Sequence, residues 1–319
     1  MKILIAEPKD FSDKALDYLG KKFEIDLAEN LSQEEFEDAL FHYDIIWFRL
    51  KYNVLKLTEE QKLRCKYIVC PVTGVNHISE KFIKQHNIKL ISLKGETTFL
   101  KEITPTAELA IFLAISVMRN SVVSIEDVKN GNWDRDKFRG NELKDKKIGI
   151  IGFGRLGEMT AKLFSAFGCE IIVFDPNKDS LNYTTFEHKE NIADVFKICD
   201  VISIHVDLNP TTTKLIDQNL LRLCKGSYLI NTSRGEVLNE KEVINAIELG
   251  NLKGFAADVI ENEAINYKES ELFQYAINTD KNIILTPHIG GNTYESFEKT
   301  EMFVANKLIK QIKQDGRTL

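Results

Sequence analysis

The stretch Lys147-Ile-Gly-Ile-Ile-Gly152-Phe-Gly154-Arg-Leu-Gly157 decides the expected fold of this chain. Its first five residues form an apolar run typical of a buried strand, and its glycines lead into a helical pattern, Glu158–Phe167, closed by Gly168. In such a unit the first glycine allows a tight turn, the second lets the backbone approach a phosphate group, and the third lets helix and strand pack closely. The stretch therefore predicts a nucleotide-binding sheet.

Asp175 supplies the second part of this pattern. It follows the next predicted strand, Glu170–Phe174, and lies 18 residues after Gly157 (175 − 157 = 18), near the offset of about 20 residues at which a carboxylate holds the ribose hydroxyls of a dinucleotide. The same carboxylate would repel a 2′-phosphate, so we expect NAD rather than NADP. S-adenosylmethionine-binding folds use similar turns, and an ordinary strand-to-helix turn is a further alternative, so the loop alone indicates no reaction.

Short β-type runs alternate with helical segments along the chain, which predicts α/β architecture with two doubly wound parallel sheets. Strands of the first sheet are expected at Ile3–Ala6, Phe23–Leu27, Asp44–Phe48, Tyr67–Cys70 and Lys89–Ser92, with helices at Ser32–Leu40 and Thr58–Arg64. Those of the second are expected at Lys147–Ile151, Glu170–Phe174, Asp200–Val206, Ser227–Thr232, Gly254–Val259 and Asn282–Leu285. One long helix is expected between Ile103 and Asn130, and a final one between Thr293 and Lys313.

Composition limits the classes of partner. The 319 residues are 43% hydrophobic and 28% charged, which is typical of a two-domain globular protein. A net charge of −6 argues against a nucleic-acid partner, and the longest apolar run, Ile111–Met118, is too short to span a membrane. The five cysteines lack the spacing of a metal site. We therefore expect a cytoplasmic protein with no nucleic-acid partner, no membrane partner and no metal.

Polar residues end the predicted strands of the second sheet, where parallel α/β proteins bind their ligands. Oxidising a hydroxyl to a ketone needs a base for the proton, a cation that holds a neighbouring carboxylate, and a hydride acceptor. His288 suits the first role, and Arg234 suits the second because its planar fork grips a carboxylate. An acidic partner would fix the tautomer of His288; Glu263 is placed for this, with Glu261 as the competing candidate.

Three segments then carry a family resemblance: Asn231-Thr-Ser-Arg-Gly235, Asp258-Val-Ile-Glu-Asn-Glu263 and Leu285-Thr-Pro-His-Ile-Gly-Gly291. They resemble the signatures of the D-isomer-specific 2-hydroxyacid dehydrogenases, phosphoglycerate dehydrogenases in particular, and they follow the glycine turn in family order. The resemblance implies a flavodoxin-like substrate domain made of residues 1–101 and 291–319, a Rossmann NAD-binding domain made of residues 102–290, and a homodimer.

The resemblance also implies roles for single residues. Arg234, Glu263 and His288 are expected to be catalytic. Cofactor contacts are expected from Gly152, Gly154, Arg155, Leu156, Gly157, Asp175, His205, Val206, Thr211, Thr232, Ser233, Asp258, His288 and Gly290. Substrate contacts are expected from Arg49, Val72, Thr73, Gly74 and Arg234.

Departures from the family pattern leave the substrate, a small 2-hydroxy or 2-keto acid, open. Ala264 replaces a usual proline, the stretch 264–281 is longer than usual, Asn76-His77 replaces an Asp-Asn pair, and residues 93–101 differ from the common segment. A 3-phosphoglycerate or sugar-acid dehydrogenase is the leading expectation, and a glyoxylate/hydroxypyruvate or D-lactate reductase is the alternative. From another class, NAD-sensing corepressors in the family keep the same three residues, so a binding protein is a further alternative.

Overall fold

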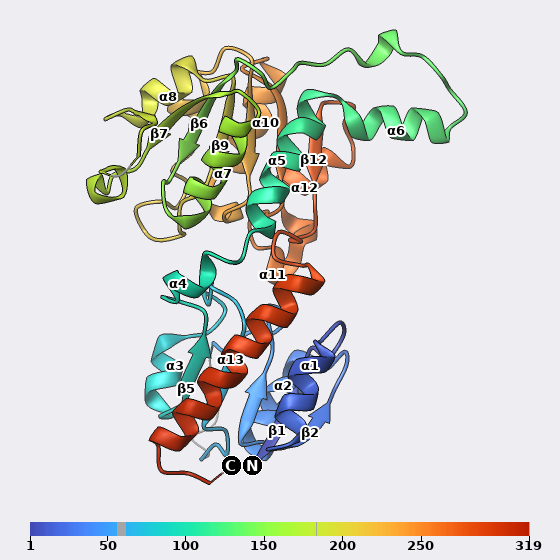
Figure 1. Ribbon diagram of the computed structural model, residues 1–319. Coiled ribbons are helices and arrows are strands. Elements are labelled where there is room, and N and C mark those ends of the chain that lie inside the picture. The colour runs from blue at the N-terminus through green and yellow to red at the C-terminus, as the bar shows by residue number, and fades with distance from the viewer. Residues whose placement is uncertain (56–61, 183, 319) are drawn as a thin grey trace. The chain divides into compact units, whose positions relative to one another are not determined.

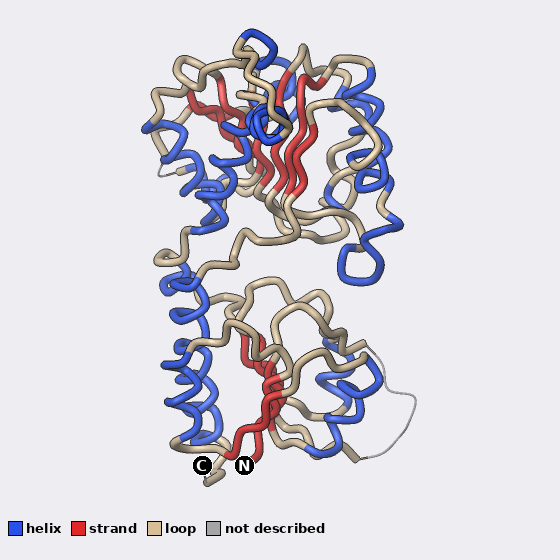
Figure 2. The backbone as a smooth tube through the Cα atoms, turned by 90° about the vertical axis from the view of Figure 1, so that its right-hand side faces the viewer, coloured by secondary structure: helices blue, strands red, loops and turns tan. Residues whose placement is uncertain are grey.

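The computed structural model describes residues 1–55, 62–182 and 184–318. The chain divides into two compact units, Met1–Ile103 with Asn292–Leu319, and Thr104–Gly291. Each unit has its own parallel sheet with helices on both faces (Figures 1 and 2). The domain limits expected from the sequence lie within two residues of these divisions.

The first unit has a five-stranded sheet in the order β2-β1-β3-β4-β5, in which all neighbours are parallel. This is the flavodoxin-like order. Its strands are β1 (Lys2–Ile5), β2 (Glu24–Leu27), β3 (Ile45–Trp47), β4 (Tyr67–Cys70) and β5 (Lys89–Ser92). Its helices are α1 (Asp13–Gly20), α2 (Gln33–His42), α3 (Glu80–Gln85), α4 (Thr97–Leu100) and α13 (Tyr294–Gln314), the last of which packs against α1, β4 and β5.

The second unit has a seven-stranded parallel sheet in the order β12-β11-β10-β9-β6-β7-β8. Its strands are β6 (Lys147–Ile151), β7 (Glu170–Phe174), β8 (Glu187–His188), β9 (Val201–Ile204), β10 (Ser227–Asn231), β11 (Leu252–Ala257) and β12 (Ile283–Leu285). The chain builds outward from β6 to β8 and then returns to place β9 on the other side of β6. The order therefore reverses between β6 and β9, which is where doubly wound sheets bind ligands.

Eight α-helices of the described residues belong to the second unit: α5 (Pro105–Met118), α6 (Ser121–Lys129), α7 (Arg155–Ala166), α8 (Ile192–Ile198), α9 (Gln218–Leu221), α10 (Glu240–Glu248), α11 (Glu263–Asn266) and α12 (Glu271–Ala276). Short 3-10 turns occupy Asp136–Phe138, Lys178–Leu181, Gly235–Val237 and Tyr267–Glu269. The buried strands β9 and β10 are apolar along most of their length because helices cover both faces of the sheet. The expected fold class, a flavodoxin-like and a Rossmann sheet, is confirmed.

Several expected elements differ from the structure. The single helix expected between Ile103 and Asn130 is wrong: α5 and α6 are separate, because Asn120 adopts a left-handed conformation with φ 52°. Asparagine is one of the few residues that tolerate this conformation. The helix expected over Thr58–Arg64 lies partly outside the described residues, and residues 62–64 are not helical. Strand β8 was not expected, since its two residues carry no apolar pattern.

Within the described ranges, no single helix is long and apolar enough to cross a membrane. The pair Thr97–Met118 and Ser121–Lys129, bent by 67°, passes the same test by length and composition.

Candidate active site

The glycine turn after β6 forms a cradle that requires glycine at two positions, because any side chain there would collide with neighbouring backbone. Gly152 has φ 89°, and a Cβ there would lie 2.8 Å from the backbone of His205. A Cβ on Gly157 would lie 2.0 Å from the carbonyl oxygen of Gly152. A Cβ on Gly154, by contrast, would meet no heavy atom within 4 Å. Since α7 begins at Arg155 directly after it, the N-terminal end of this helix lies beside that open position, which is where doubly wound sheets bind phosphates.

Asp175 joins the end of β7 to this turn. One carboxylate oxygen accepts a hydrogen bond from the amide of Phe153 at 2.7 Å, and the other accepts from the amide of Asn177 at 2.8 Å. Each oxygen keeps a lone pair for a further donor, such as a ribose hydroxyl. The carboxylate is thus oriented toward the glycine turn by the protein itself.

A cavity of about 260 Å³ lies beside Asp175. Two of its lining residues are lysines, but each is paired with a glutamate: Lys178 with Glu190 at 3.0 Å, and Lys189 with Glu187 at 2.6 Å. Their charges are therefore already compensated, and the carboxylate of Asp175 faces the same space. This electrostatic arrangement suits a ribose with free hydroxyls better than one carrying a 2′-phosphate.

Two buried polar atoms beside the switch point have no hydrogen-bond partner within the described part of the chain. They are Oγ1 of Thr232, after β10, and Nδ1 of His205, after β9. The other ring nitrogen of His205 lies 2.8 Å from the hydroxyl of Ser203. Burial lowers the pKa of His205 to about 3, so its ring is neutral near pH 7. Unsatisfied buried groups are rare in folded proteins, and both of these lie just after strands at the carboxyl edge of the sheet, near the point where the strand order reverses.

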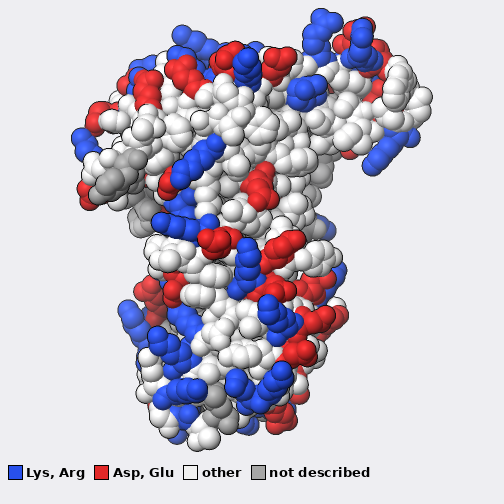
Figure 3. All heavy atoms as spheres, viewed as in Figure 1, with Lys and Arg blue, Asp and Glu red and all other residues white. Residues whose placement is uncertain are grey.

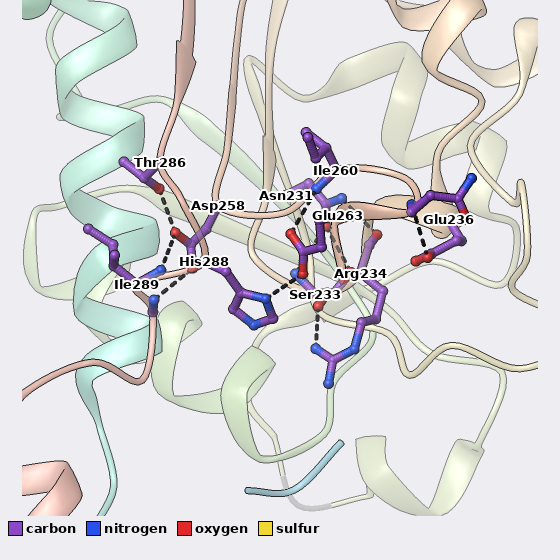
Figure 4. Close-up of polar contacts among 12 residues, drawn as sticks. Asn231, Ser233, Arg234, Glu236, Asp258, Ile260, Glu263, Thr286, His288 and Ile289 are labelled. Atoms are coloured by element: carbon purple, nitrogen blue, oxygen red, sulfur yellow. Dashed lines mark hydrogen bonds and ion pairs between the residues drawn. The ribbon is translucent and has the colours of Figure 1, made fainter. Parts of the chain in front are cut away.

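His288 and Glu263 are brought together from two different loops. Nδ1 of His288, just after β12, is hydrogen-bonded to Oε1 of Glu263, the first residue of α11 (Figure 4). Nε2 lies on the opposite side of the ring from this bond. Glu261, the competing candidate, instead pairs with Lys214 at 3.8 Å. His288 has φ 53°, a strained conformation for a residue other than glycine, and such strain is common at functional sites.

Arg234 extends from the loop after β10, next to Glu263 (Figure 4). Its guanidinium donates to the carbonyl of Ser233 at 2.7 Å, and no acidic side chain of the described residues pairs with it. The loop itself is held by Asn231, whose amide group donates to the Arg234 carbonyl at 2.9 Å and accepts from the Ser233 hydroxyl at 2.8 Å. Arg234 therefore offers an uncompensated cation on a fixed loop.

Asp258, after β11, anchors the loop that carries His288. Its buried carboxylate accepts hydrogen bonds from the Thr286 hydroxyl at 2.6 Å and from the amides of Ile289 and Gly290 at 2.8 and 2.7 Å. Burial raises the pKa of Asp258, and these hydrogen bonds oppose the rise. A Cβ on Gly290 would lie 2.9 Å from this carboxylate, so the loop requires a glycine at this position.

The remaining expected cofactor residues lie around the same edge of the sheet. Arg155 and Leu156 begin α7, and the side chain of Val206 packs where a Cβ of Gly152 would be. Thr211 is exposed, and its hydroxyl is bonded to Asn209 in a turn after β9. Of the expected substrate residues, Arg234 belongs to this unit; Val72, Thr73 and Gly74 follow β4 in the first unit.

Arg49 does not resemble a free anion-binding residue. Its guanidinium forms an ion pair with Glu301, a fully buried residue of α13, and donates to the carbonyl of Glu7 at 3.1 Å. It also stacks 4.0 Å above the ring of Phe297. Burial raises the pKa of Glu301, and the charge of Arg49 opposes the rise. Within the first unit, Arg49 therefore connects the ends of β1 and β3 to α13.

Four residues that hold the site together received no role from sequence reasoning: Asn231 and Thr286, which were noted only as polar residues at the ends of strands, and Glu236 and Glu240, which were missed. The first two lie inside the quoted segments, where a polar residue beside the catalytic candidates was the available signal. The two glutamates lie in the region around an amphipathic helix and look like ordinary surface residues in the sequence. Among the described residues, no group of three His, Cys, Asp or Glu side chains could hold a metal ion.

Comparisons with known proteins agree with this geometry. Residues 111–290 match the family model described as D-isomer specific 2-hydroxyacid dehydrogenase, NAD binding domain. The chain is 29% identical to a D-3-phosphoglycerate dehydrogenase of Methanocaldococcus jannaschii over 98% of its own length but only 58% of the relative's. It is 26% identical to a hydroxypyruvate reductase of Thermotoga maritima over 98% of both chains. The chain thus spans little more than half of the first relative and nearly all of the second.

A solved structure, D-lactate dehydrogenase from Aquifex aeolicus complexed with NAD and lactic acid, superposes with a TM-score of 0.81. The two sequences are 22% identical, and the match covers 99% of this chain and 96% of that chain. At this identity the likeness shows a shared fold.

The neutral state of His205 predicts a pH dependence of stability. Unfolding returns the ring to its ordinary pKa of 6.5, so the unfolded chain binds one more proton than the folded chain between about pH 3 and 6.5. The stabilisation that comes from burying a neutral His205 ring is therefore complete above pH 6.5 and is lost as the pH falls toward 3. In His205→Gln the fall in unfolding free energy should be shallower, by up to about 1.4 kcal/mol per pH unit, as measured by urea denaturation. Equal slopes for both proteins would contradict the assignment.

The ion pair of Arg49 predicts a loss of stability rather than of substrate affinity. Arg49→Met would leave the Glu301 carboxylate buried without its cation and should lower the free energy of unfolding by about 3–5 kcal/mol. Arg49→Met combined with Glu301→Leu should recover most of this loss, and the exposed Lys51→Met is the control. If Arg49→Met unfolds like the unmodified protein and only raises KM, Arg49 binds substrate instead.

Proposed function

The chain belongs to the D-isomer specific 2-hydroxyacid dehydrogenase family, because that family's NAD binding domain model matches more than half of it, and we propose that it is an NAD-dependent oxidoreductase of 2-hydroxy acids. The observation that carries this proposal is the set of Arg234, Glu263 and His288 at one edge of the second sheet. In it a histidine is oriented by a carboxylate through Nδ1, and an arginine without an acidic partner lies on a neighbouring loop.

Cofactor binding rests on the cradle described above. The glycine turn would hold the pyrophosphate at the start of α7, and Asp175 would accept from the ribose hydroxyls. The unpartnered Thr232 and His205 atoms lie after the adjoining strands β10 and β9. When bound there, NAD would supply the hydride acceptor for C2 of the hydroxy acid in oxidation, and NADH would supply the hydride donor in reduction.

His288 acts in this proposal as the base that removes the hydroxyl proton during oxidation. Nε2 takes the proton, and the ring becomes a cation whose charge the carboxylate of Glu263 stabilises through Nδ1. In reduction the same nitrogen returns the proton to the oxygen at C2. Because Glu263 occupies Nδ1, the neutral ring presents Nε2 in the acceptor tautomer that oxidation needs.

Arg234 binds the substrate carboxylate and polarises the oxygen at C2. A guanidinium forms two parallel hydrogen bonds with a carboxylate, which fixes the acid relative to the histidine. The loop bonds of Asn231 hold the backbone of Arg234 in place while the side chain stays available. Asp258 positions His288 through the loop, and we assign it a contact with the nicotinamide amide as well, with Ser233 and Gly290 beside it.

The substrate in this proposal is a small, non-phosphorylated 2-keto or 2-hydroxy acid, of which hydroxypyruvate is the leading candidate. The observation that favours it over 3-phosphoglycerate is Arg49, whose charge is already compensated by Glu301 and which is therefore a poor phosphate anchor. A relative matched over 98% of its own length is named hydroxypyruvate reductase. Positive and negative side chains are interspersed on the face shown in Figure 3, which agrees with a small-molecule substrate rather than a nucleic acid.

A homodimer completes the proposal. Helix α6 has no buried residue, and its apolar side chains Val122, Ile125 and Val128, spaced three residues apart on one side of the helix, are 37%, 55% and 49% exposed. The left-handed turn at Asn120 directs α6 away from the rest of the second unit (Figure 1). A row of apolar side chains on an extended helix is typical of a protein interface, and a second copy offers the same surface in return.

Turnover of a 2-keto acid panel with NADH, followed by the nicotinamide absorbance, tests the activity. His288→Ala should lower kcat by a factor on the order of 10³ while NADH affinity is retained, because only the proton transfer is removed. Undiminished turnover would refute the role of His288. NADH binding by the unmodified protein without turnover of any acid would favour the corepressor-like alternative, and faster turnover of phosphohydroxypyruvate than of hydroxypyruvate would overturn the substrate proposal.

If α6 forms the dimer interface, negative charge placed on its apolar side should separate the two copies. Ile125→Asp with Val128→Asp should convert the protein to a monomer in sedimentation experiments, because two carboxylates would be buried in an apolar interface. Asn130→Asp, at the exposed C-cap of the same helix and on the side away from Ile125, adds negative charge without touching the apolar row and should leave the dimer intact. A monomeric unmodified protein would contradict the proposal.

A further inference from the structure

Glu263 lies in a segment that has little regular structure of its own. It begins α11, which has four residues, and the preceding Asn262 adopts a left-handed conformation with φ 58°. The segment continues through a 3-10 turn to α12. The amide of Ile260 donates to Oε2 of Glu263 at 3.4 Å, so the orientation of this carboxylate depends on where the backbone of the segment is held. Contacts from elsewhere in the unit hold that backbone.

The carboxylate of Glu240 supplies those contacts. Glu240 is the first residue of α10 and is 5% exposed. One of its oxygens accepts from the amide of Glu261 at 2.8 Å. The other accepts from the hydroxyl of Ser270 at 2.8 Å and from the amide of Leu272 at 3.2 Å. A single buried side chain thus binds both ends of the segment that carries Glu263.

The same region links Glu263 to the arginine loop. Gly235, directly after Arg234, packs so closely that a Cβ would lie 2.0 Å from the backbone carbon of Ile260. Glu236 accepts from the amide of Asn262 at 3.4 Å (Figure 4). The loops of Arg234 and Glu263 are therefore fastened together immediately before α10, the helix that presents Glu240.

Three donors converge on Glu240, and only a carboxylate has acceptor oxygens for all of them. A glutamine has one oxygen, and its NH₂ group would oppose a donor on the other side. A buried donor left without a partner is costly, so the segment would have to move. Its movement would pass to Glu263, which lies two residues after Glu261, and from there to the ring of His288.

We propose that Glu240 is a positioning residue for the reaction, which holds Glu263 in place and, through it, the imidazole of His288. This inference rests on the proposed function, in which His288 moves the proton. Glu240 touches neither substrate nor cofactor in this proposal. Its effect is therefore on the orientation of the histidine, and not on the binding of NADH.

Glu240→Gln tests the inference. We expect kcat to fall about 10- to 100-fold, as for a misplacement on the order of 1 Å at the reacting groups, with the Kd of NADH unchanged. Ser270→Ala is the matched control, because it removes one donor to Glu240 and the cap of α12 but leaves the bond to Glu261. It should lower Tm to a similar extent while kcat stays within about twofold. Equal kcat losses in the two variants would reduce Glu240 to a structural role and overturn the proposal.

A double variant separates the path through Glu263 from other paths. If Glu240 acts through Glu263, Glu240→Gln should reduce kcat by less than about twofold in a Glu263→Gln background. If the kcat losses of the two single variants multiply in the double variant, Glu240 acts independently of Glu263, which would contradict the inference.

Nuclear magnetic resonance of the protein with ¹⁵N-labelled histidine gives a readout that does not depend on turnover. The Nδ1 signal of His288 should shift in Glu240→Gln toward that of Glu263→Gln, and it should not shift in Ser270→Ala. An unchanged signal in Glu240→Gln overturns the inference even if the unmodified protein reduces no acid in the panel. Absence of turnover with the expected shift would refute only the proposed function.

Discussion

The hydrogen bond between Glu263 and His288 is the interaction on which the site depends. Its two residues follow neighbouring strands, β11 and β12, and Arg234 follows β10, the next strand in the sheet. The bond therefore exists only because parallel strands end at one edge, where loops far apart in sequence come together. Asp258, Gly235 and Glu240 fix the backbones of these loops, so the geometry is set mainly by contacts between main chain and carboxylate.

Most of the second sheet follows from local sequence. The strands at Lys147–Ile151 and Glu170–Phe174 were predicted with their observed bounds, because each is a short apolar run between turn residues. The break at Asn120 was not predictable from periodicity, since apolar residues continue on both sides of it. A single residue in a left-handed conformation, rather than a change in composition, ends α5. Strand β8 was also not predictable, because its two exposed residues carry no apolar pattern and become a strand only by pairing with β7.

The sequence predicted which residues belong to the candidate site, but not which of their charges are left without an ionic partner. Arg234 and Arg49 look alike in the sequence, and both were expected to bind substrate. The structure distinguishes them by their partners: Glu301 reaches Arg49 from a helix some 250 positions later (301 − 49 = 252), and no described acid pairs with Arg234. In the same way, Glu263 and Glu261 are distinguished by their partners, because Glu263 is bonded to His288 and Glu261 pairs with Lys214. Long-range pairing decides which charges remain available, and no local pattern reports it.

The left-handed backbone of His288 has a consequence for how stability and activity are related in this protein. A β-carbon is disfavoured at φ 53° by an amount on the order of 1 kcal/mol, so the loop would fold more readily with glycine there than with histidine. If His288 is the base, selection of variants for thermal resistance alone would therefore drift toward an inactive protein at this position. The proposed base occupies a backbone conformation that glycine would adopt at a lower cost.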